Sequence, residues 1–396
     1  MPVAIEAIRD IVGRSSGLQK ELKKLNYEPS GKKGLERVYN VTEAARLVGR
    51  TTTAIRDAEA RGDLPEPKVD PATKRRLGYR LAELHYMRQR FATLPGRNPQ
   101  EDEPCVLSIQ NFKGGVGKST ISLHLAQYLA QQGYDVCFID CDSQASATRM
   151  FGFVPDVEIA EDETLLPFFQ GEQRSIRYAI RDTYWDNLRL IPANLALYGA
   201  EYFLAARARN ESGYRHFYHW LRDGIAEVCG DFDVVVIDPP PALGMISLNV
   251  LYAATGVVVP MPPSMMDFHS TTQFFTMLEE VLSSIPESLE YDFIRILVSR
   301  KQQRTQDTSS EDDVTALAED FYGKYLMRNI LYDSNEIRSA AAMGKTVYEL
   351  TGATSSQKTY KRAVESLDSV CGEIEELIRA TWPSKQRPAA RARAGR

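Results

Sequence analysis

A glycine-rich segment, residues 111–120 with the sequence NFKGGVGKST, holds the residue types of a phosphate-binding loop. Its end fits the pattern G-x-x-x-x-G-K-[ST]. Glycines let backbone N–H groups curl around an anion at a helix N-terminus, a lysine can reach the β- and γ-phosphates, and a serine hydroxyl can bind Mg²⁺. We therefore expect a nucleotide site formed by Lys113, Gly114, Gly115, Val116, Gly117, Lys118, Ser119 and Thr120.

The beginning of this loop departs from the common pattern. Phe112 stands where the first glycine is expected, and a second lysine, Lys113, follows directly. A plain turn between a strand and a helix is the alternative to a phosphate loop. Three glycines followed by Lys-Ser-Thr make that alternative weak. The missing glycine and the added cation need an explanation of their own.

Two further segments place acids after apolar runs. FIDCDSQASAT, residues 138–148, contains Asp140 and Asp142, and DVVVIDPPPALG, residues 233–244, contains Asp238. Alternate residues of an extended segment point to opposite faces, so one of the first two acids can address a Mg²⁺ shell where the chain turns. An acid after four apolar residues can hold a Mg²⁺-bound water at the end of a strand, although many buried strands end in Asp without such a role. The candidate magnesium residues are Ser119, Asp140, Asp142 and Asp238.

The elements that must position these residues alternate between strands and helices. Apolar runs predict strands at 105–110, 135–140, 188–192, 233–238, 256–261 and 293–299. Such runs are typical of strands that are buried on both faces of a parallel sheet. Helices are expected between them, at 118–132, 245–254, 267–284, 312–325 and 360–380. This alternation predicts an α/β fold with a doubly wound, mostly parallel sheet, preceded by an N-terminal all-α, winged helix-turn-helix domain.

Residues 29–97 carry that N-terminal pattern. Two short helices are expected about Gly49, the second capped by Thr51 or Thr52, and a turn at 70–73 lies between basic residues. The order resembles the winged helix of MerR-type DNA-binding domains, although a helical hairpin without DNA contact is the alternative. The candidate DNA contacts are Thr51, Thr52, Thr53, Arg56, Lys74, Arg75 and Arg76.

Composition and charge complete the organisation. Residues 1–100 hold 20 Lys and Arg against 12 Asp and Glu, and the last thirteen residues hold five basic residues and no acid, in a chain of net charge −5. Basic ends on an acidic body favour a nucleic-acid partner, although charge alone does not decide this. No run approaches the roughly 20 apolar residues of a membrane span. The expected regions are an amphipathic helix at 1–28 that is a candidate for dimerisation, the helix-turn-helix at 29–97, a linker at 98–104, a nucleotide domain at 105–383 and a basic disordered tail at 384–396.

The five cysteines are expected to be buried free thiols of a reducing cytosol. Cys137 and Cys141 are spaced C-x3-C without a nearby histidine, which disfavours a zinc site.

The segment KGGVGKST resembles the deviant Walker A box of the ParA/MinD group of ATPases. In that family the extra lysine, here Lys113, reaches across a dimer interface to the partner's nucleotide, where its charge acts in trans. The resemblance implies that Lys113, Lys118 and Asp142 are catalytic. It implies that Asp142 orients the attacking water and that Asp140 supports the Mg²⁺ site. Ser143 stands where the family usually has proline.

The whole chain is similar to the larger ParA-type plasmid partition ATPases, including the RepA proteins of repABC-type replicons. This implies a slow, Mg²⁺-dependent ATPase that dimerises on ATP, binds DNA without sequence preference and is released when a centromere-binding, ParB-type partner stimulates hydrolysis. The helix-turn-helix often represses the protein's own operon in that family. A cytoplasmic, nucleoid-associated protein is implied. Further candidate DNA contacts are Arg338 and Lys345, with Lys301 and Arg304 as others.

Three other functions remain to be weighed. A nucleotide-regulated repressor without a partition role is the main alternative, although Asp142 favours hydrolysis. A MinD-like membrane protein would need an apolar face in its terminal helix, which RPAARARAGR does not offer. An iron-protein relative would need cluster-ligating cysteines in loops, whereas most of these lie in predicted strands.

Overall fold

The computed structural model describes residues 5–15, 33–210, 214–285, 289–303 and 309–386 of the chain. Contacts divide it into two units, 1–34 and 35–396, which are described separately. In the first unit residues 5–15 form a helix whose apolar side chains Ile5, Ile8 and Val12 are exposed. The rest of the amphipathic segment expected at 1–28, like residues 387–396 of the basic tail, lies outside the described residues.

The larger unit begins with three helices and a hairpin. They are α2 (Val41–Val48), α3 (Thr52–Ala60), β1 (Lys68–Val69), β2 (Arg76–Gly78) and α4 (Leu81–Phe91). Asn40 and Glu43 form a capping box that starts α2, and Gly49 ends it with φ 68°. The Thr51 side chain caps α3. Two helices joined at Gly49 and a following antiparallel hairpin thus occur where the sequence predicts them.

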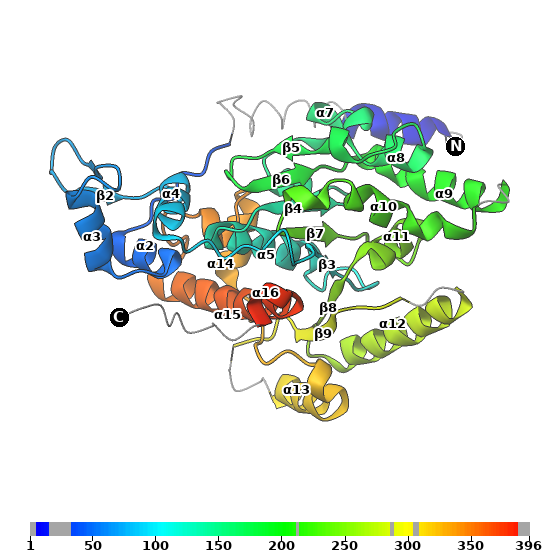
Figure 1. Ribbon diagram of the computed structural model, residues 1–396. Helices are drawn as coiled ribbons and strands as arrows, with labels where there is room; N and C mark the ends of the chain where they lie inside the picture. Colours follow the sequence, from blue (N-terminus) through cyan, green and yellow to red (C-terminus); the bar gives the residue numbers. More distant parts are fainter. Residues whose placement is uncertain (1–4, 16–32, 211–213, 286–288, 304–308, 387–396) are drawn as a thin grey trace. The chain divides into compact units, whose positions relative to one another are not determined.

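A seven-stranded sheet forms the centre of this unit (Figure 1). The strand order is β5–β6–β4–β7–β3–β8–β9, and every neighbouring pair is parallel except β5 with β6. The strands are β3 (Cys105–Ile109), β4 (Val136–Asp140), β5 (Arg181–Asp182), β6 (Leu188–Ile191), β7 (Val234–Asp238), β8 (Gly256–Met261) and β9 (Phe293–Val298). The doubly wound, mostly parallel α/β sheet is confirmed, and the short antiparallel edge strand β5 is an addition to it.

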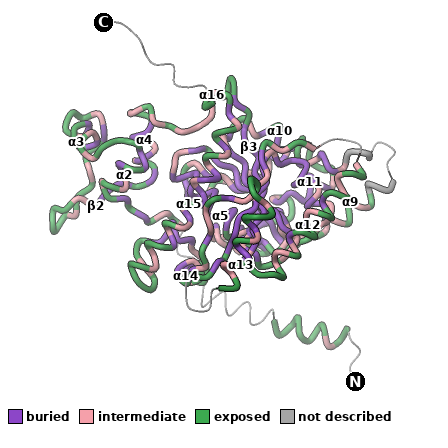
Figure 2. Tube along the Cα trace, turned by 90° about the horizontal axis from the view of Figure 1, so that it is seen from below, coloured by how far each residue is buried: buried purple, intermediate pink, exposed green. Residues whose placement is uncertain are grey.

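Successive residues of each strand enter different hydrophobic clusters, because side chains alternate across a sheet. Leu107 and Phe138 pack in the cluster that contains α5, whereas Val106 and Ile139 pack in the cluster that contains α11. Burial is concentrated along the strands (Figure 2). The helices of this part are α5 (Lys118–Gln132), α6 (Ser146–Met150), α7 (Pro155–Glu158), α8 (Leu166–Gln170), α9 (Gly199–Asn210), α10 (Trp220–Ala226), α11 (Met245–Ala253), α12 (Met265–Ser284), α13 (Ser309–Tyr322), α14 (Asn335–Ala342), α15 (Gln357–Thr381) and α16 (Pro383–Gln386).

The segment expected as a linker at 98–104, together with Arg97 directly before it, packs against residues that surround the central sheet. Arg97 donates to the carbonyl oxygens of Phe232, at 3.0 Å, and Gly230, at 2.7 Å. Asp102 is buried and accepts hydrogen bonds from Ser384 in α16. The start of the predicted tail is therefore helical and bonded to the predicted linker.

Residues 35–91 share their hydrophobic core with the sheet. One cluster of buried side chains runs from Tyr39, Leu47 and Ile55 to α5 and to strand β3. All five cysteines are free, and only Cys229 among them is not fully buried. Within the described part of the chain, no helix has both the length and the apolar character needed to cross a membrane.

Candidate nucleotide site

The phosphate loop joins the end of β3 to the start of α5. Gly115 and Gly117 have φ values of 77° and 102°, which side chains rarely tolerate, so glycine is required at both positions. No side chain caps the N-terminus of α5, and its first N–H groups are left for a ligand. The Lys118 ammonium is 3.0 Å from the Lys113 carbonyl oxygen, which holds the side chain back along the loop.

A pocket of about 520 Å³ opens in front of this loop. All of the predicted nucleotide residues except Lys113 and Val116 line it, and so does Asp142. Val116 is buried behind the loop. Further lining residues come from segments that the sequence did not single out as nucleotide-binding: Arg300, Leu331, Tyr332, Asp333, Ser334 and Ile337.

The extra lysine is held within its own chain. The Lys113 ammonium lies 2.5 Å from Asp267 Oδ1 in the first turn of α12, and Ser264 bonds the other oxygen of that carboxylate. Phe112, which replaces the first glycine, packs its ring against Phe274 of α12 with centroids 4.5 Å apart. Both departures from the common loop pattern therefore attach the loop to α12. The sequence shows an acid three residues after a helix-capping serine, but not its pairing with Lys113.

The acids of the two other segments meet at the carboxyl edge of the sheet. Asp140 and Asp238 are register partners on β4 and β7, and both are fully buried. Asp140 Oδ2 accepts hydrogen bonds from the backbone N–H, at 2.9 Å, and the hydroxyl, at 2.7 Å, of Thr148. Asp238 Oδ1 is 3.3 Å from the Ser122 hydroxyl, whereas its Oδ2 is buried without a partner among the described residues.

The electrostatics of this edge suit a divalent cation. Burial, and for Asp238 also the charge of Asp140, raises the pKa of both carboxyls. A cation beside Asp238 would supply the missing partner of its buried oxygen and favour its charged form. The donor set of a hydroxyl from Ser119 and carboxylates from Asp238 and Asp142 is the one that Mg²⁺ prefers. Asp140, with its oxygens already engaged by Thr148 and the Asp142 N–H, is placed to orient the Asp142 turn.

Lys118 shares this edge of the sheet. Burial lowers the pKa of Lys118, although the carboxylates of Asp238 and Asp142 oppose the shift. A buried lysine that faces acids across an open pocket can bind an anionic ligand with little screening by water. The structure therefore brings Lys118, Ser119, Asp142 and Asp238 together.

Arg338, predicted as a DNA contact, lines the nucleotide pocket. Its guanidinium forms an ion pair with Asp333 and bonds Asn335. Lys345 lies 3.9 Å from Glu36 and is partly exposed. These placements neither require nor prevent DNA contact, which stays a prediction for both residues.

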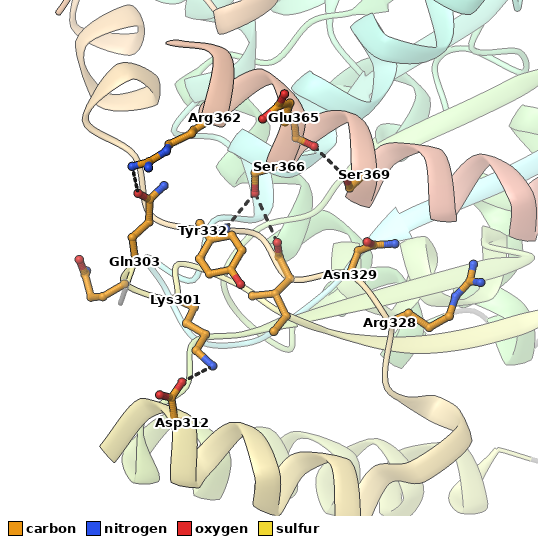
Figure 3. A pocket seen from close by; sticks show the side chains of 12 residues that line it. Lys301, Gln303, Asp312, Arg328, Asn329, Tyr332, Arg362, Glu365, Ser366 and Ser369 are labelled. Atoms are coloured by element: carbon orange, nitrogen blue, oxygen red, sulfur yellow. Dashed lines mark hydrogen bonds and ion pairs between the residues drawn. The ribbon is translucent and has the colours of Figure 1, made fainter. Parts of the chain in front are cut away.

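Lys301 is a correction to the expected DNA surface. Its side chain is buried, and its ammonium lies 2.8 Å from Asp312 and 3.1 Å from the Thr315 hydroxyl. Figure 3 shows this pair at the base of a second pocket, of about 700 Å³, whose opposite wall carries Arg362 and Glu365 of α15. An ammonium that is buried and already paired with Asp312 does not lie on the exposed surface that a DNA duplex would contact. Arg304 lies outside the described residues.

The candidate DNA contacts of the N-terminal helices lie at the start of α3, in the turn of the hairpin and at the start of β2. Thr51, Thr53, Arg56, Lys74 and Arg75 are exposed, and Thr52 is half-buried. Arg76 forms an ion pair with Glu59 of α3 and so joins the hairpin to that helix. Contact with DNA stays a prediction for this whole set.

Comparisons with known proteins agree with this site. Residues 105–291 match a protein-family model described as an AAA domain. The chain is 34% identical over 356 residues to protein SopA of Escherichia coli strain K12, covering 88% of this chain and 90% of that protein. It is 31% identical over 370 residues to a putative replication protein A of Rhizobium rhizogenes, covering 90% of each.

A solved structure described as a partition protein has the same fold. It superposes with a TM-score of 0.67 at 19% identity and covers 95% of this chain and 99% of the other. Together with the sequence relatives and the P-loop geometry, this places the chain in a family. The protein belongs to the partition ATPases, the family that includes SopA and the RepA-like replication proteins.

Proposed function

We propose that this protein is an ATP-driven DNA partition switch. It binds MgATP, dimerises on it, binds DNA without sequence preference, and leaves DNA when a ParB-type partner stimulates hydrolysis to ADP and phosphate. The observation that carries the proposal is the convergence of Lys118, Ser119 and Asp142 at one pocket, with the buried carboxylate of Asp238 near Lys118. A protein that only sensed nucleotide would not need an acid beside the phosphate cradle.

Each residue has a part in that reaction. Lys118 and the N–H groups of the loop bind the β- and γ-phosphates, and bound Mg²⁺ would neutralise phosphate charge beside Ser119 and Asp238. Asp142 lines the pocket, where its carboxylate can orient the attacking water, and Asp140 holds its turn. Lys113 leaves Asp267 and reaches the nucleotide of a second copy, where its charge stabilises the transition state.

DNA binding involves two surfaces. Sequence-independent binding requires the dimer and basic residues that include Lys345, so that it falls steeply with salt. Binding to the protein's own operator uses α3 and the basic hairpin, through Arg56, Lys74 and Arg75, and represses transcription. The exposure of these side chains supports this assignment.

Binding to a random-sequence DNA duplex tests the proposal. It would be measured at fixed moderate salt without nucleotide, with ADP, with ATP and with a slowly hydrolysed ATP analogue. We expect binding only with ATP or the analogue, loss of binding in Lys113→Ala, and retained binding without turnover in Asp142→Ala. Lys361→Ala, which removes an exposed lysine of α15, is the matched control and should bind as the wild type does.

The same experiment with promoter DNA distinguishes the second candidate function. If random DNA is ignored in every nucleotide state while promoter DNA is bound, the protein is a nucleotide-regulated repressor and the partition switch is rejected. In either case Arg75→Ala should weaken promoter binding and lower the salt slope by about one, because one phosphate contact is lost.

A further inference from the structure

Two consecutive carbonyl oxygens of the phosphate loop are bound by two consecutive residues from another part of the sheet. The Ser299 hydroxyl donates to the Val116 carbonyl oxygen at 3.1 Å, and the Arg300 guanidinium donates to the Gly115 carbonyl oxygen at 2.6 Å. Ser299 and Arg300 directly follow β9, at the edge of the sheet and two strands away from β3, which leads into the loop. Neither residue belongs to the three sequence segments expected to bind nucleotide.

The planarity of the peptide bond gives these contacts a consequence. In a trans peptide the C=O of one residue and the N–H of the next point in opposite directions. Holding the Gly115 and Val116 carbonyls toward β9 therefore turns the N–H groups of Val116 and Gly117 away from it. These are two successive N–H groups immediately before α5, in the part of a phosphate loop whose N–H groups bind the anion.

The backbone of Arg300 is itself held in an uncommon conformation. Its φ is 56°, a region that side chains other than glycine seldom adopt, and such conformations persist where the surroundings enforce them. The neighbours provide that restraint. The Ser299 N–H donates to Met261, at 3.0 Å, and the Lys301 N–H donates to Leu331, at 3.2 Å. The chain turns at Arg300 so that its side chain reaches back to Gly115 and lines the nucleotide pocket.

We propose that Ser299 and Arg300 are positioning residues that orient the phosphate loop by pinning its Gly115 and Val116 carbonyls. A glycine-rich loop is free to rotate these peptides, and fixing them before the ligand arrives removes part of the ordering cost of binding. Ser299 is fully buried, so its hydroxyl holds the Val116 carbonyl in a single orientation. The inference rests on the proposed nucleotide function of the loop and adds two residues to it.

Direct titration of a fluorescent ADP in the presence of Mg²⁺ tests this role, because ADP affinity depends on neither hydrolysis nor DNA. We expect Arg300→Met and Ser299→Ala each to weaken ADP binding about tenfold, the effect of losing one well-oriented hydrogen bond. Arg300→Gly should weaken it equally, although glycine relieves the backbone conformation at this position. Ser299→Thr keeps the hydroxyl and should restore binding to within about threefold of the wild type.

Two controls separate the effect of the Ser299 and Arg300 hydrogen bonds from a general effect on strand β9. Arg295→Met removes an arginine of β9 whose guanidinium donates to the Ile294 carbonyl oxygen, and this variant should bind ADP as the wild type does. Thermal unfolding without nucleotide should show a cooperative transition for each variant, which means that each is folded before heating. Amide hydrogen exchange of residues 114–117 in the ligand-free protein should become faster in Arg300→Met and Ser299→Ala but not in Arg295→Met.

The outcomes are distinct. If the wild type binds ADP and both Arg300→Met and Ser299→Ala bind it equally well, the inference is overturned while the proposed function stands. It is also overturned if only Arg300→Met is affected, because Arg300 would then act through its charge alone, or if Arg295→Met is affected equally. If the wild type binds neither ADP nor ATP, the proposed function itself fails.

Discussion

The two ends of helix α5 differ in what contacts their free backbone groups. At its N-terminus the first N–H groups have no capping side chain and face an open pocket with Lys118 and Arg300 beside it. At its C-terminus the carbonyls are engaged by residues of the N-terminal helices. His85 of α4 lies 3.1 Å from the Ala130 carbonyl oxygen, and Arg88 of α4 donates to that of Gln131.

The contrast shows which end is built for a ligand and which for the fold. A helix N-terminus attracts anions and its C-terminus attracts cations, so both ends use the same dipole. At the C-terminus the cation is a fully buried part of the protein: Arg88, whose pKa burial lowers to about 10. Gly133 ends the helix with φ 100°, and a Cβ there would lie 2.9 Å from the Arg88 Cδ. At the N-terminus the counter-charge is left to be supplied from outside.

The largest effect is expected from a substitution that removes the buried arginine at the C-terminal end of α5. Arg88→Ala removes a buried side chain that bonds the Leu47 and Gln131 carbonyls, so we expect the free energy of unfolding to fall by about 3 to 5 kcal/mol. Urea unfolding measures this. Arg90→Ala, on the exposed face of the same helix, should cost no more than about 0.5 kcal/mol. Equal losses in the two variants would contradict a structural role for the buried guanidinium.

The next largest effect is expected from a substitution at the N-terminal end of α5. Lys118→Ala removes the ammonium that faces the acids of the pocket, and we expect ADP affinity to fall at least about 100-fold, which corresponds to about 2.7 kcal/mol. Unfolding without nucleotide should change by less than about 1 kcal/mol, because the lysine is itself desolvated. Isothermal titration and urea unfolding of one sample set give both numbers. A variant that still bound ADP tightly would separate this loop from phosphate binding.

A smaller effect comes from the middle of the same helix. His124 is buried between the Thr120 carbonyl and the Val347 N–H, and burial lowers its pKa to about 4. The unfolded chain takes up the proton at about pH 6.5, so stability is lost as pH falls from there toward 4, by about 1.4 kcal/mol per pH unit at most. His124→Gln should flatten this part of the stability profile. The exposed His269→Gln should leave it as in the wild type.

The smallest effect concerns the loop lysine. Asp267→Asn removes the partly exposed ion pair with Lys113, and we expect a loss of about 0.5 to 1 kcal/mol in stability. Because Lys113 would no longer be held within its own chain, ATP should promote dimerisation at a severalfold lower protein concentration. Light scattering with and without ATP checks this, with the exposed Asp320→Asn as control. Unchanged or weaker dimerisation would mean that the pair does not compete with the dimer.

Several features follow from local sequence. The phosphate loop, the parallel strands and helix α5 with its bounds were predicted because glycine spacing and buried apolar runs act over short distances. The Asn40 and Thr51 side chains start α2 and α3 through local hydrogen bonds, and Gly49 ends α2 at the break that the sequence predicts. The short strand β5 and the helices at 199–210 and 335–342 were not predicted, since tertiary packing contributes much of the stability of such elements.

The types and spacing of the loop lysines and of the acids were therefore visible in the sequence. Their long-range partners were not. Asp267 for Lys113, Ser299 and Arg300 for the loop carbonyls, and Arg88 for the end of α5 are joined by contacts between residues far apart in sequence. Sequence spacing fixes which side chains share a strand or a helix face, whereas only the order of strands in the sheet decides which loops meet at its edge.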